Sequence, residues 1–513
     1  MFAFIMKRLG TLVVILFGSS FILYNLTAIS GDPIEQYRFA TDLKAKQELA
    51  ALVRQLDLNT PPPLRYFKWL KGILGIFTGH LNLGMTRLNQ SVSDRLIGAI
   101  PTTLRLITAA TLFAIVLGII LGITTALRQY SRFDYTITFF SFLMFSLPIF
   151  WVAVLLKEFL AIKFNDFLAR ATIPIGWIIV LSLVSAFFWA GILGRNRKLV
   201  IRVFSIAFFA SVVLLSFMSL TKWFASPKLG PIVVFIFAIG IAYGVTALST
   251  GLESKPALRA TQSLAVITLV LYYPLNYLFN HYSSIWLILL LFAATMASAV
   301  GLSLYFTKID RGPVIRTATI AGALMGLVVI IDRLVQTWTP YLSMEGVNGR
   351  PIPTVGQIDP LLSNPPFWVS LLDRSVHLFL PTIALTLISF AGYIRFSRGT
   401  LLEVMNQDYI RTARAKGLPE RTVVVRHAFR NTLIPLTTII VVDLAGVIGG
   451  AIITERVFGW SGMGTLFNEA ISGLDLNLLM GVFACTATLS VLANLVADLL
   501  YAALDPRIRV ESK

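Results

Sequence analysis

Cysteine and charged residues are both scarce in this chain of 513 residues. The single cysteine, Cys485, excludes a disulfide within the chain. Asp, Glu, Lys and Arg together make up 13% of the sequence, against about 25% in a typical soluble domain. The four histidines are dispersed and lack the spacing of metal ligands. A soluble globular domain is therefore excluded, and we expect no metal site and no cofactor.

A nucleotide-binding motif is also missing from the sequence. No stretch follows the pattern G-x-x-x-x-G-K-[ST], whose backbone amides cradle phosphate groups. The apolar runs contain no cluster of polar residues that could form a catalytic site at membrane depth. We therefore expect the chain not to be an enzyme, so any ATP chemistry coupled to it belongs to another subunit.

Apolar residues dominate the chain instead. Hydrophobic side chains make up 56% of it, and the mean hydropathy is +0.79. Apolar runs of about 20 residues recur, which is the length a helix needs to cross a hydrocarbon core of roughly 30 Å. Inside a bilayer only helices and closed barrels satisfy their backbone groups. These runs therefore predict an all-α polytopic membrane protein.

The net charge of +18 does not indicate a nucleic-acid partner. Lys and Arg gather in short links between the apolar runs, as the positive-inside rule describes for cytoplasmic loops. Examples are RNRK at 195–198, ESKPALR at 253–259 and TKIDRGPVIR at 307–316. We therefore expect membrane lipid, and no nucleic acid, around this chain.

The apolar runs predict twelve spans, with both termini in the cytoplasm. The first run, 9–29, is too long for a typical signal peptide and is interpreted as a retained span. The others are expected at about 102–127, 135–160, 173–192, 199–219, 230–250, 261–280, 285–306, 317–336, 379–398, 433–455 and 478–503. Residues 34–98 and 337–376 are then extracytoplasmic, and a short amphipathic helix around Tyr66 and Trp69 is expected near the lipid headgroups.

One polar, basic stretch, DYIRTARAKGLPERTVVVRHAFRN, interrupts the apolar pattern at 408–431. Leu402, Met405, Tyr409 and Ala413 predict one narrow apolar stripe on a helix, which ends in a turn at Gly417. Pro419 suits the first turn of a second helix. The small pair Ala413 and Gly417 would let another surface approach closely. An alternative is a basic amphipathic segment that rests on anionic lipid.

This stretch resembles the cytoplasmic coupling loop, or EAA loop, of ABC importer permeases of the dipeptide/oligopeptide type. The matching residues are Asp408, Tyr409, Arg411, Ala413 to Gly417, His427, Ala428, Arg430 and Asn431. Arg411 and Thr412 stand where the general motif has Glu and the first Ala, whereas Ala413 and Gly417 are retained. This departure favours the peptide-type branch of the superfamily.

The resemblance covers about 1–163 and 376–510. It includes GDP at 31–33, LDLNTPPPLRYFKWL at 56–70, Leu83-Gly84, IPTTLRL at 100–106, FSLPIFW at 145–151, HLFLPT at 377–382 and ERVFGWSGMG at 455–464, where Ser461 replaces the usual proline. Residues 164–375 lie outside it and are interpreted as an insertion. The chain then divides into 1–98, 99–163, the insertion at 164–375, and 376–513 with a coupling loop at about 406–431.

The resemblance implies the six-helix transmembrane core of an ABC type I importer, here with an inserted bundle of about six further helices. It implies a permease subunit of the bacterial plasma (inner) membrane that moves di- or oligopeptides by alternating access. Its partners would be a second homologous permease subunit, two cytoplasmic ATP-binding subunits and an extracytoplasmic substrate-binding protein. Nickel chelates or another small solute remain alternative cargoes. A secondary transporter remains an alternative class, although the two halves of the chain show no repeat. A receptor or scaffold that docks a cytoplasmic protein through 408–431 is a further alternative.

The resemblance also assigns residues to sites. Coupling to the ATPase falls to Arg411, Ala413, Arg414, Ala415, Lys416, Gly417, His427 and Arg430. The external gate region falls to Glu455, Trp460, Gly462 and Gly464, for which the alternative is a glycine-rich turn with an interfacial tryptophan. Asp443, an ionisable residue within a span, is the candidate for the translocation path. Its alternative role is a hydrogen bond that packs two helices.

Overall fold

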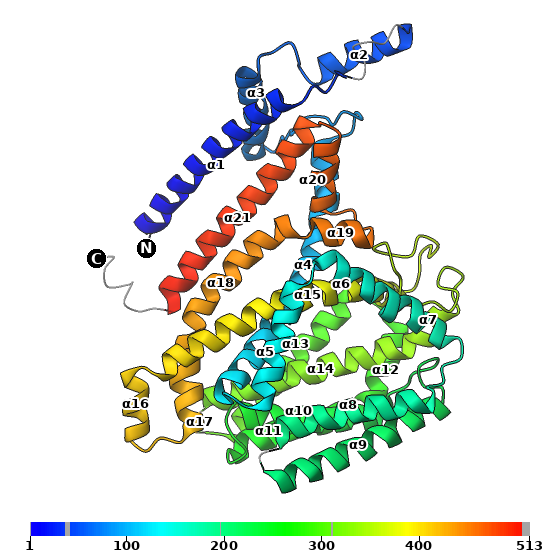
Figure 1. The fold of residues 1–513 in the computed structure, drawn as a ribbon, viewed down its shortest axis with the longest axis vertical. Helices are drawn as coiled ribbons and strands as arrows, with labels where there is room; N and C mark the ends of the chain where they lie inside the picture. The colour runs from blue at the N-terminus through cyan, green and yellow to red at the C-terminus, as the bar shows by residue number, and fades with distance from the viewer. Residues whose placement is uncertain (1, 36–41, 195, 309–310, 505–513) are drawn as a thin grey trace. The chain divides into compact units, whose positions relative to one another are not determined.

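The computed structural model describes residues 2–35, 42–194, 196–308 and 311–504 (Figure 1). Regular structure in these ranges is helical, apart from one isolated bridge between Met85 and Ser91. The contacts between Cα atoms divide the chain into two compact units. Unit 1 consists of Met1–Glu158, Thr354–Gly356 and Leu378–Lys513, and unit 2 of Phe159–Pro353 and Gln357–His377.

Unit 1 contains the long apolar helices at both ends of the chain. Its α-helices are α1 (Phe2–Ser30), α2 (Leu43–Gln55), α3 (Pro62–Leu74), α4 (Val92–Leu127), α5 (Arg132–Ser146), α6 (Ile149–Leu156), the part of α15 (Phe367–Met405) from Leu378 on, α16 (Asp408–Ala415), α17 (Glu420–Thr422), α18 (Phe429–Gly450), α19 (Ile452–Phe458), α20 (Met463–Ser472) and α21 (Leu476–Leu504). Two short segments of other helical type are η2 (Gly75–Thr78) and η4 (Val423–Ala428).

The predicted amphipathic helix around Tyr66 is present as α3, and its aromatic residues pack against other helices. Tyr66 and Trp69 are buried in a cluster with Tyr24 of α1 and Met480 of α21. The Tyr66 hydroxyl shares a 2.8 Å hydrogen bond with the hydroxyl of Ser20. The rings of Tyr24 and Tyr66 pack edge to face, with their centroids 5.6 Å apart. The helix is therefore held against α1 and α21 by its aromatic side chains, and its place near the headgroups stays a prediction.

Small residues bring α4 and α15 into close contact. A Cβ atom on Gly118 would overlap the Cβ of Tyr393, and one on Gly122 would overlap Oγ of Ser397. Ser397 donates to the carbonyl oxygen of Gly118 at 3.1 Å. Glycine at such positions lets membrane helices approach closely enough for backbone groups to accept hydrogen bonds across the interface.

Unit 2 is a helical bundle that is built on alanine. Its helices are α7 (Lys163–Leu168), α8 (Ile175–Leu193), α9 (Arg197–Leu220), α10 (Gly230–Leu248), α11 (Lys255–Val270), α12 (Tyr272–His281), α13 (Ile285–Phe306), α14 (Arg311–Leu342) and the part of α15 up to His377, with η3 (Lys157–Ile162) at the junction of the units. Fully buried alanines, among them Ala242, Ala260, Ala299 and Ala318, join α10, α11, α13 and α14. α8 and α9 pack side by side (Figure 1).

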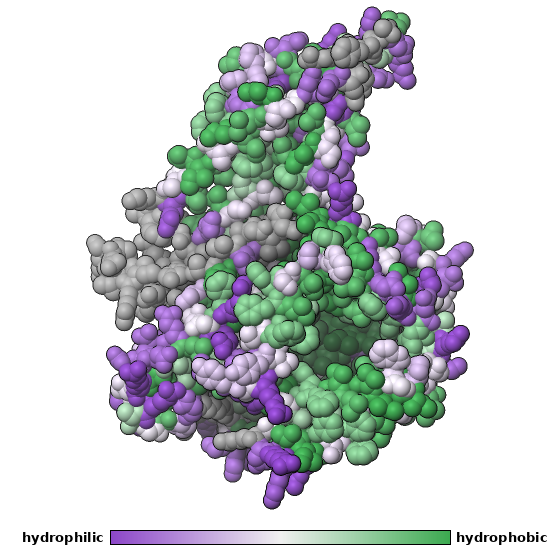
Figure 2. Space-filling model, viewed as in Figure 1, coloured by the Kyte–Doolittle hydropathy of each residue, from purple (hydrophilic) through white to green (hydrophobic). Residues whose placement is uncertain are grey.

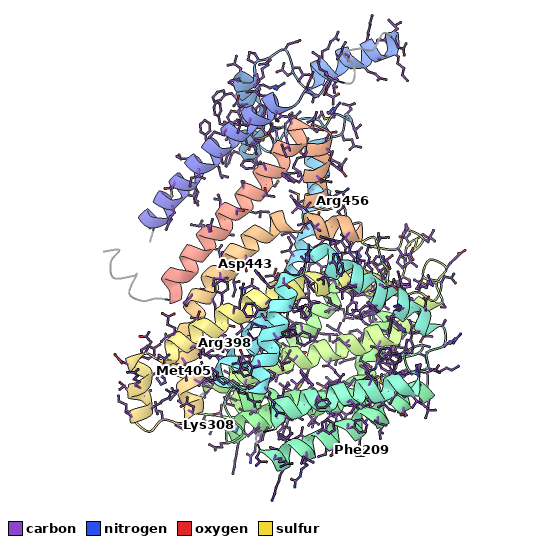
Figure 3. The ribbon with its side chains drawn as sticks, in the orientation of Figure 1. Phe209, Lys308, Arg398, Met405, Asp443 and Arg456 are labelled. Carbon is purple, nitrogen blue, oxygen red and sulfur yellow. The ribbon has the colours of Figure 1, made fainter. Side chains whose placement is uncertain are left out.

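Large apolar side chains point outward over much of the molecule, as Figure 2 shows in green. Phe209 on α9, which Figure 3 labels, is 65% exposed, and Val14 on α1 is 70% exposed. Water would penalise so much exposed apolar surface, whereas acyl chains cover it without cost. The outward apolar surface therefore agrees with a membrane location.

Two of the twelve predicted spans, 135–160 and 261–280, are bent in the structure. Among the described residues, nine helices are long and apolar enough to cross a membrane, or up to eleven if each of the two bent pairs is one span. The remaining predicted span, 433–455, falls on α18, of which Asn431–Val441 is a shorter apolar part. Between α5 and the helical segment 149–168 the chain bends by 104°, and between α11 and α12 by 54°. Pro148 and Pro274 stand at these breaks, where a missing N–H interrupts the helical ladder. Apolar run length does not reveal such bends.

Candidate functional site

The polar stretch at 408–431 folds as a short helix, a glycine turn and a return helix. α16 covers Asp408–Ala415, Gly417 has a φ of +75°, and Pro419 precedes α17, which leads through η4 into α18. The amide of Gly417 donates to the carbonyl of Arg414 at 2.9 Å, which closes the end of α16. A positive φ at this position suits glycine because it has no Cβ. The predicted helix–glycine turn–helix is therefore present.

The apolar stripe predicted from Leu402 to Ala413 does not lie on one helix. α15 ends at Met405, and α16 begins at Asp408. The amides of Asn406 and Gln407 bond to carbonyls only three residues earlier, which tightens the chain and ends α15. The stripe is therefore split between two helices that meet at a corner.

The buried side of α16 packs against its own chain. Ile410 is fully buried and Ala413 is 6% exposed, in a cluster with Leu401 of α15 and Ala428 of η4. Ala126 at the end of α4 belongs to the same cluster. The expectation that Ala413 presents a small surface to another protein is therefore wrong, because its methyl group fills the space between α16 and the helices behind it.

The outer side of α16 is polar and open. The residues exposed there include Arg411, Arg414, Ala415, Lys416 and Gly417. A Cβ atom on Gly417 would meet no atom within 4 Å, so the turn itself faces open space. Six of the eight residues predicted for coupling lie on α16 or in the turn that follows it. Ala413 is buried, and the other five are exposed.

Charges on the outer side are partly paired. Arg414 donates two hydrogen bonds to the carboxylate of Glu420, with Nε at 3.2 Å and Nη2 at 2.8 Å. These bonds lower the pKa of Glu420 and raise the pKa of Arg414. Arg411 lies 3.6 Å from the carboxylate of Asp408. The Arg414–Glu420 pair bridges the glycine turn, so it holds α16 and α17 at a defined angle.

The second part of the stretch contributes two further predicted residues. His427 is half-buried on η4. The side chain of Arg430 lies outside the part of the chain that the structure describes. Beside it, Asn431 donates to the Tyr409 hydroxyl at 2.8 Å. The two ends of the polar stretch are therefore tied together directly.

A bidentate ion pair next to this loop was missed by the sequence reasoning. Arg398 on α15 donates to both carboxylate oxygens of Asp134 on α5, at 3.2 and 3.1 Å. Asp134 is 3% exposed, and its side chain also accepts from the amide of Tyr130. The only sequence signal was the capping pattern Ser131-x-x-Asp134 at the start of α5. Figure 3 labels Arg398 and Met405 on the same helix.

Asp443 lies on α18, where Figure 3 labels it. Its carboxylate accepts a hydrogen bond from the hydroxyl of Tyr393 on α15. Tyr393 is 1% exposed. The bond joins two helices, as the packing alternative for this aspartate expected. Asp443 is only half-buried, and its place in the translocation path stays a prediction.

The residues predicted for the external gate gather in one tight corner between α19 and α20. Glu455 is fully buried, and its carboxylate accepts from the Thr103 hydroxyl at 2.6 Å and from the amide of Thr465 at 2.9 Å. The amide of Met463 donates to the same Thr103 hydroxyl at 2.7 Å. The Glu455 carboxylate thus accepts a hydrogen bond from a backbone amide in the first turn of α20, and it also joins this turn to α4.

The corner between α19 and α20 leaves no room for a side chain at Gly462 or Gly464. A Cβ on Gly462 would overlap the carboxylate of Glu455 and the hydroxyl of Thr103. A Cβ on Gly464 would lie 2.6 Å from Cα of Ile452. Trp460 is 5% exposed, so its ring packs within the protein. The corner is closely packed, and α19 and α20 are each too short to cross a bilayer.

These features define a polytopic helical membrane protein with a polar helix–turn–helix between its apolar helices. Residues 192–510 match the family model described as "Binding-protein-dependent transport system inner membrane component". The match covers more than half of the chain, and the chain belongs to this family.

Curated relatives carry names of peptide permeases. The chain is 43% identical over 143 residues to the oligopeptide transport system permease protein OppB of Mycobacterium tuberculosis (strain ATCC 25618 / H37Rv), which covers 28% of this chain and 44% of the relative. It is 33% identical over 234 residues to the dipeptide transport system permease protein DppB of Escherichia coli (strain K12), with 42% and 68% covered. The di/tripeptide permease DppB of Pseudomonas aeruginosa (strain UCBPP-PA14) is 37% identical over 232 residues, with 43% and 68% covered. The chain thus spans less than half the length of the first of these relatives.

Proposed function

We propose that this chain is the permease subunit of an ATP-driven importer of di- or oligopeptides. The observation that carries this proposal is the two-sided geometry of α16. Its outer side presents Arg411, Arg414, Lys416 and the open turn at Gly417, whereas its inner side is anchored through Ile410 and Ala413. A partner that binds the outer side of such a helix can displace it, and the displacement is transmitted to the helices that pack behind it.

The apolar cluster behind α16 can transmit this displacement to other helices. Ile410 and Ala413 contact Leu401 at the end of α15 and Ala126 at the end of α4, while Ala428 leads into α18. Close-packed side chains deform little, so a displaced α16 moves these helix ends as rigid bodies. Closure of ATPase subunits against the outer side would thus tilt the apolar helices between outward-open and inward-open arrangements.

The partner subunits and the orientation in the membrane follow from the same proposal. The permease pairs with a second homologous permease, two ATP-binding subunits bind the outer side of α16, and a substrate-binding protein docks on the opposite side of the bacterial inner membrane. Both termini lie in the cytoplasm, together with the 408–431 stretch. Residues 164–375 form an insertion in the six-helix core, and Asp443 lines the path near the helices that move.

Peptides are the favoured cargo because the relatives' names specify dipeptide and oligopeptide transport. A nickel chelate or another small solute is the second candidate. The secondary-transporter alternative lacks a supporting feature, since it gives the exposed basic turn of α16 no partner.

Gly417→Trp tests the coupling role. In proteoliposomes that contain the chain, its partner permease, its ATPase subunits and the binding protein, this variant should lose peptide uptake and substrate-stimulated ATP hydrolysis. Gly349→Trp is the matched control, because Gly349 also has a positive φ (+73°) and open space around it, but lies in a loop of unit 2. If the Gly417 variant assembles and retains both activities, the proposal is wrong.

A further inference from the structure

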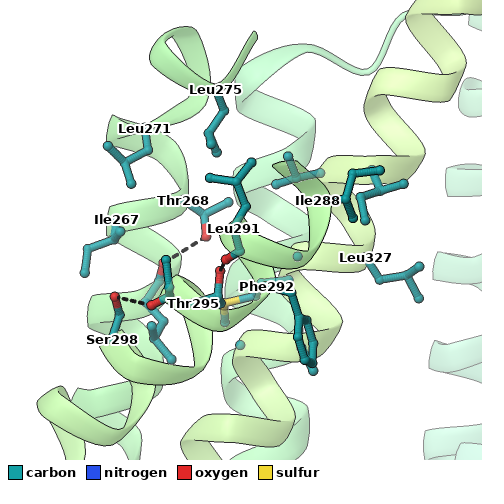
Figure 4. Close-up of a pocket in the computed structure, with 18 of the residues that line it drawn as sticks. Ile267, Thr268, Leu271, Leu275, Ile288, Leu291, Phe292, Thr295, Ser298 and Leu327 are labelled. Atoms are coloured by element: carbon teal, nitrogen blue, oxygen red, sulfur yellow. Dashed lines mark hydrogen bonds between the residues drawn. The ribbon is translucent and has the colours of Figure 1, made fainter. Parts of the chain in front are cut away.

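Unit 2 contains an apolar cavity of about 420 Å³ between α11, α12, α13 and α14 (Figure 4). Most of its wall consists of aliphatic and aromatic side chains such as Leu271, Leu291 and Phe292. The polar side chains labelled in its wall are Thr268, Thr295 and Ser298, and each hydroxyl donates to the carbonyl four residues earlier on its own helix. Their hydroxyl protons are therefore already used, so the cavity suits an apolar occupant.

The cavity has room for that occupant and can be reached from the bilayer. Gly326 on α14 lines it, and a Cβ atom there would meet nothing within 4 Å. Leu289, Phe292 and Leu327 of the wall are about half exposed, at 50%, 51% and 51%. In a membrane helix bundle, such apolar rims face acyl chains.

A second recess of about 370 Å³ adjoins the first toward one end of the bundle. Arg259, Gln262, Ser263 and Phe306 line it, and Ile267 lines both spaces. Arg259, Ser263 and Ile267 are spaced by four residues on α11 and therefore share one face of that helix. Arg259 lies about 12 Å from Ile267 along the helix axis, at 1.5 Å per residue.

The recess is at the basic end of the bundle. Arg259 is exposed one turn into α11, which begins at Lys255, and Lys308, which Figure 3 labels, follows α13 closely. A planar guanidinium at this place matches a phosphate diester, which it can bind with two N–H groups. Gln262 donates to the Tyr243 hydroxyl at 2.8 Å, which adds polar groups to the rim.

We propose that these two neighbouring spaces, which share Ile267 in their walls, form a binding site for an anionic glycerophospholipid. Its phosphate lies at Arg259 and one acyl chain passes Ile267 into the cavity between α11 and α14. A free phosphate would leave the apolar cavity unused, and an uncharged apolar molecule would leave Arg259 unused. A phospholipid uses both features, because its phosphate fits at Arg259 and its acyl chain fits in the apolar cavity beyond Ile267, further along α11. This site is separate from the proposed coupling role of α16.

Native mass spectrometry of the purified full-length chain tests the site. The delipidated protein is titrated with phosphatidylglycerol, phosphatidylcholine and inorganic phosphate. Wild-type protein should retain phosphatidylglycerol in preference to phosphatidylcholine and should not bind inorganic phosphate. Gly326→Phe should weaken phosphatidylglycerol binding about tenfold, because the ring displaces the equivalent of about two methylene groups from the cavity. Gly301→Phe is its control, since Gly301 on α13 has equally open surroundings but does not line the cavity.

Arg259→Gln should abolish the preference for phosphatidylglycerol over phosphatidylcholine. Arg202→Gln is its control, because Arg202 is exposed near the start of α9 but lines neither space. If Gly326→Phe does not yield a monodisperse protein, Ala294→Phe fills the cavity from α13 and carries the same expectation. Unchanged phosphatidylglycerol binding in the filled variant overturns the proposal, as does equal behaviour of the two arginine variants. Binding of inorganic phosphate as tight as that of the lipid overturns it too.

Discussion

Thr103 and Glu455 share a buried hydrogen bond of 2.6 Å, although 352 residues separate them in the chain. Thr103 is 1% exposed and Glu455 is fully buried. The bond joins α4, from the N-terminal half of unit 1, to the short helix α19 near its C-terminal end. The segment predicted as an external gate is thus joined to a long apolar helix by a buried hydrogen bond.

Replacing Thr103 should loosen this corner. Thr103→Val leaves the carboxylate of Glu455 and the amide of Met463 without one partner each, and an unsatisfied buried polar group costs about 1–3 kcal/mol. We expect a lower midpoint of thermal unfolding in detergent. Thr125→Val is the control, since Thr125 is also buried on α4 and its hydroxyl bonds to the carbonyl of Gly122 on its own helix. Equal destabilisation by both variants would contradict a special role for the Thr103–Glu455 bond.

Gly462→Ala should be harmful in the same corner. The added methyl group overlaps the Glu455 carboxylate and the Thr103 hydroxyl, and overpacking of this kind costs about 1–3 kcal/mol. Gly98→Ala on α4 adds the same methyl group where nothing lies within 4 Å, and it should be neutral or slightly stabilising. The comparison is made by thermal unfolding and by transport in proteoliposomes. Transport equal to that of the Gly98 variant would show that the corner tolerates displacement.

The Asp134–Arg398 pair should be needed for the stability of unit 1. Arg398→Ala removes two donors from a carboxylate that is 3% exposed, and loss of the partner of a buried polar group costs about 1–3 kcal/mol. Arg398→Lys should restore part of the loss, because it returns the charge without the second hydrogen bond. Arg395→Ala, which removes a cation over the ring of Phe145, is the control for a lost arginine on α15. The midpoints of thermal unfolding of the three variants measure how much each substitution destabilises the protein.

Low pH should release the Arg414–Glu420 bridge across the glycine turn at Gly417. Hydrogen bonds from Arg414 lower the pKa of Glu420 below its usual value of 4.5. A lowered folded-state pKa means that the stabilisation is fully present above the unfolded-state pKa and is lost as the pH falls through the lowered value. The carboxyl carbon of labelled Glu420, followed by NMR in the purified protein, should therefore titrate below pH 4.5.

Two variants check the origin of that lowered pKa. Arg414→Gln should raise the titration midpoint of Glu420 toward its usual value, because the donated hydrogen bonds are lost. Arg411→Gln is the matched control and should leave it unchanged, since Arg411 faces Asp408 instead. A midpoint that does not respond to Arg414→Gln would assign the shift to another group.

Ile410→Ala should separate binding of the ATPase subunits from transport. Ile410 is fully buried in the cluster behind α16, and removing its side chain costs about 2–5 kcal/mol of packing. The outer side of α16 keeps its charges, so ATPase subunits should still copurify while peptide uptake falls. Val425→Ala on η4 is the control, because Val425 is 44% exposed. Uptake at the wild-type level would exclude the cluster as the route of coupling.

The helix–turn–helix at 408–431 was predictable because its signals are local. A basic last turn, a glycine and a proline determine where α16 ends and where the return begins, and these residues act within a few positions of each other. The membrane class was equally predictable, since it depends only on the length and composition of apolar runs. The roles of Ala413 and Tyr66 were not predictable, because side-chain neighbours determine which face of a helix is covered.

The amino-acid sequence by itself determined that this protein lies in a membrane, that its apolar runs are helices, and that a basic turn at Gly417 interrupts them. Only the tertiary structure decided that the run at 135–160 bends at Pro148, that Thr103 meets Glu455, and that Asp134 meets Arg398. Hydropathy and helix signals are properties of neighbouring residues, whereas the Thr103–Glu455 and Asp134–Arg398 contacts join residues hundreds of positions apart. Their partners are selected by the packing of whole helices, which no local pattern encodes.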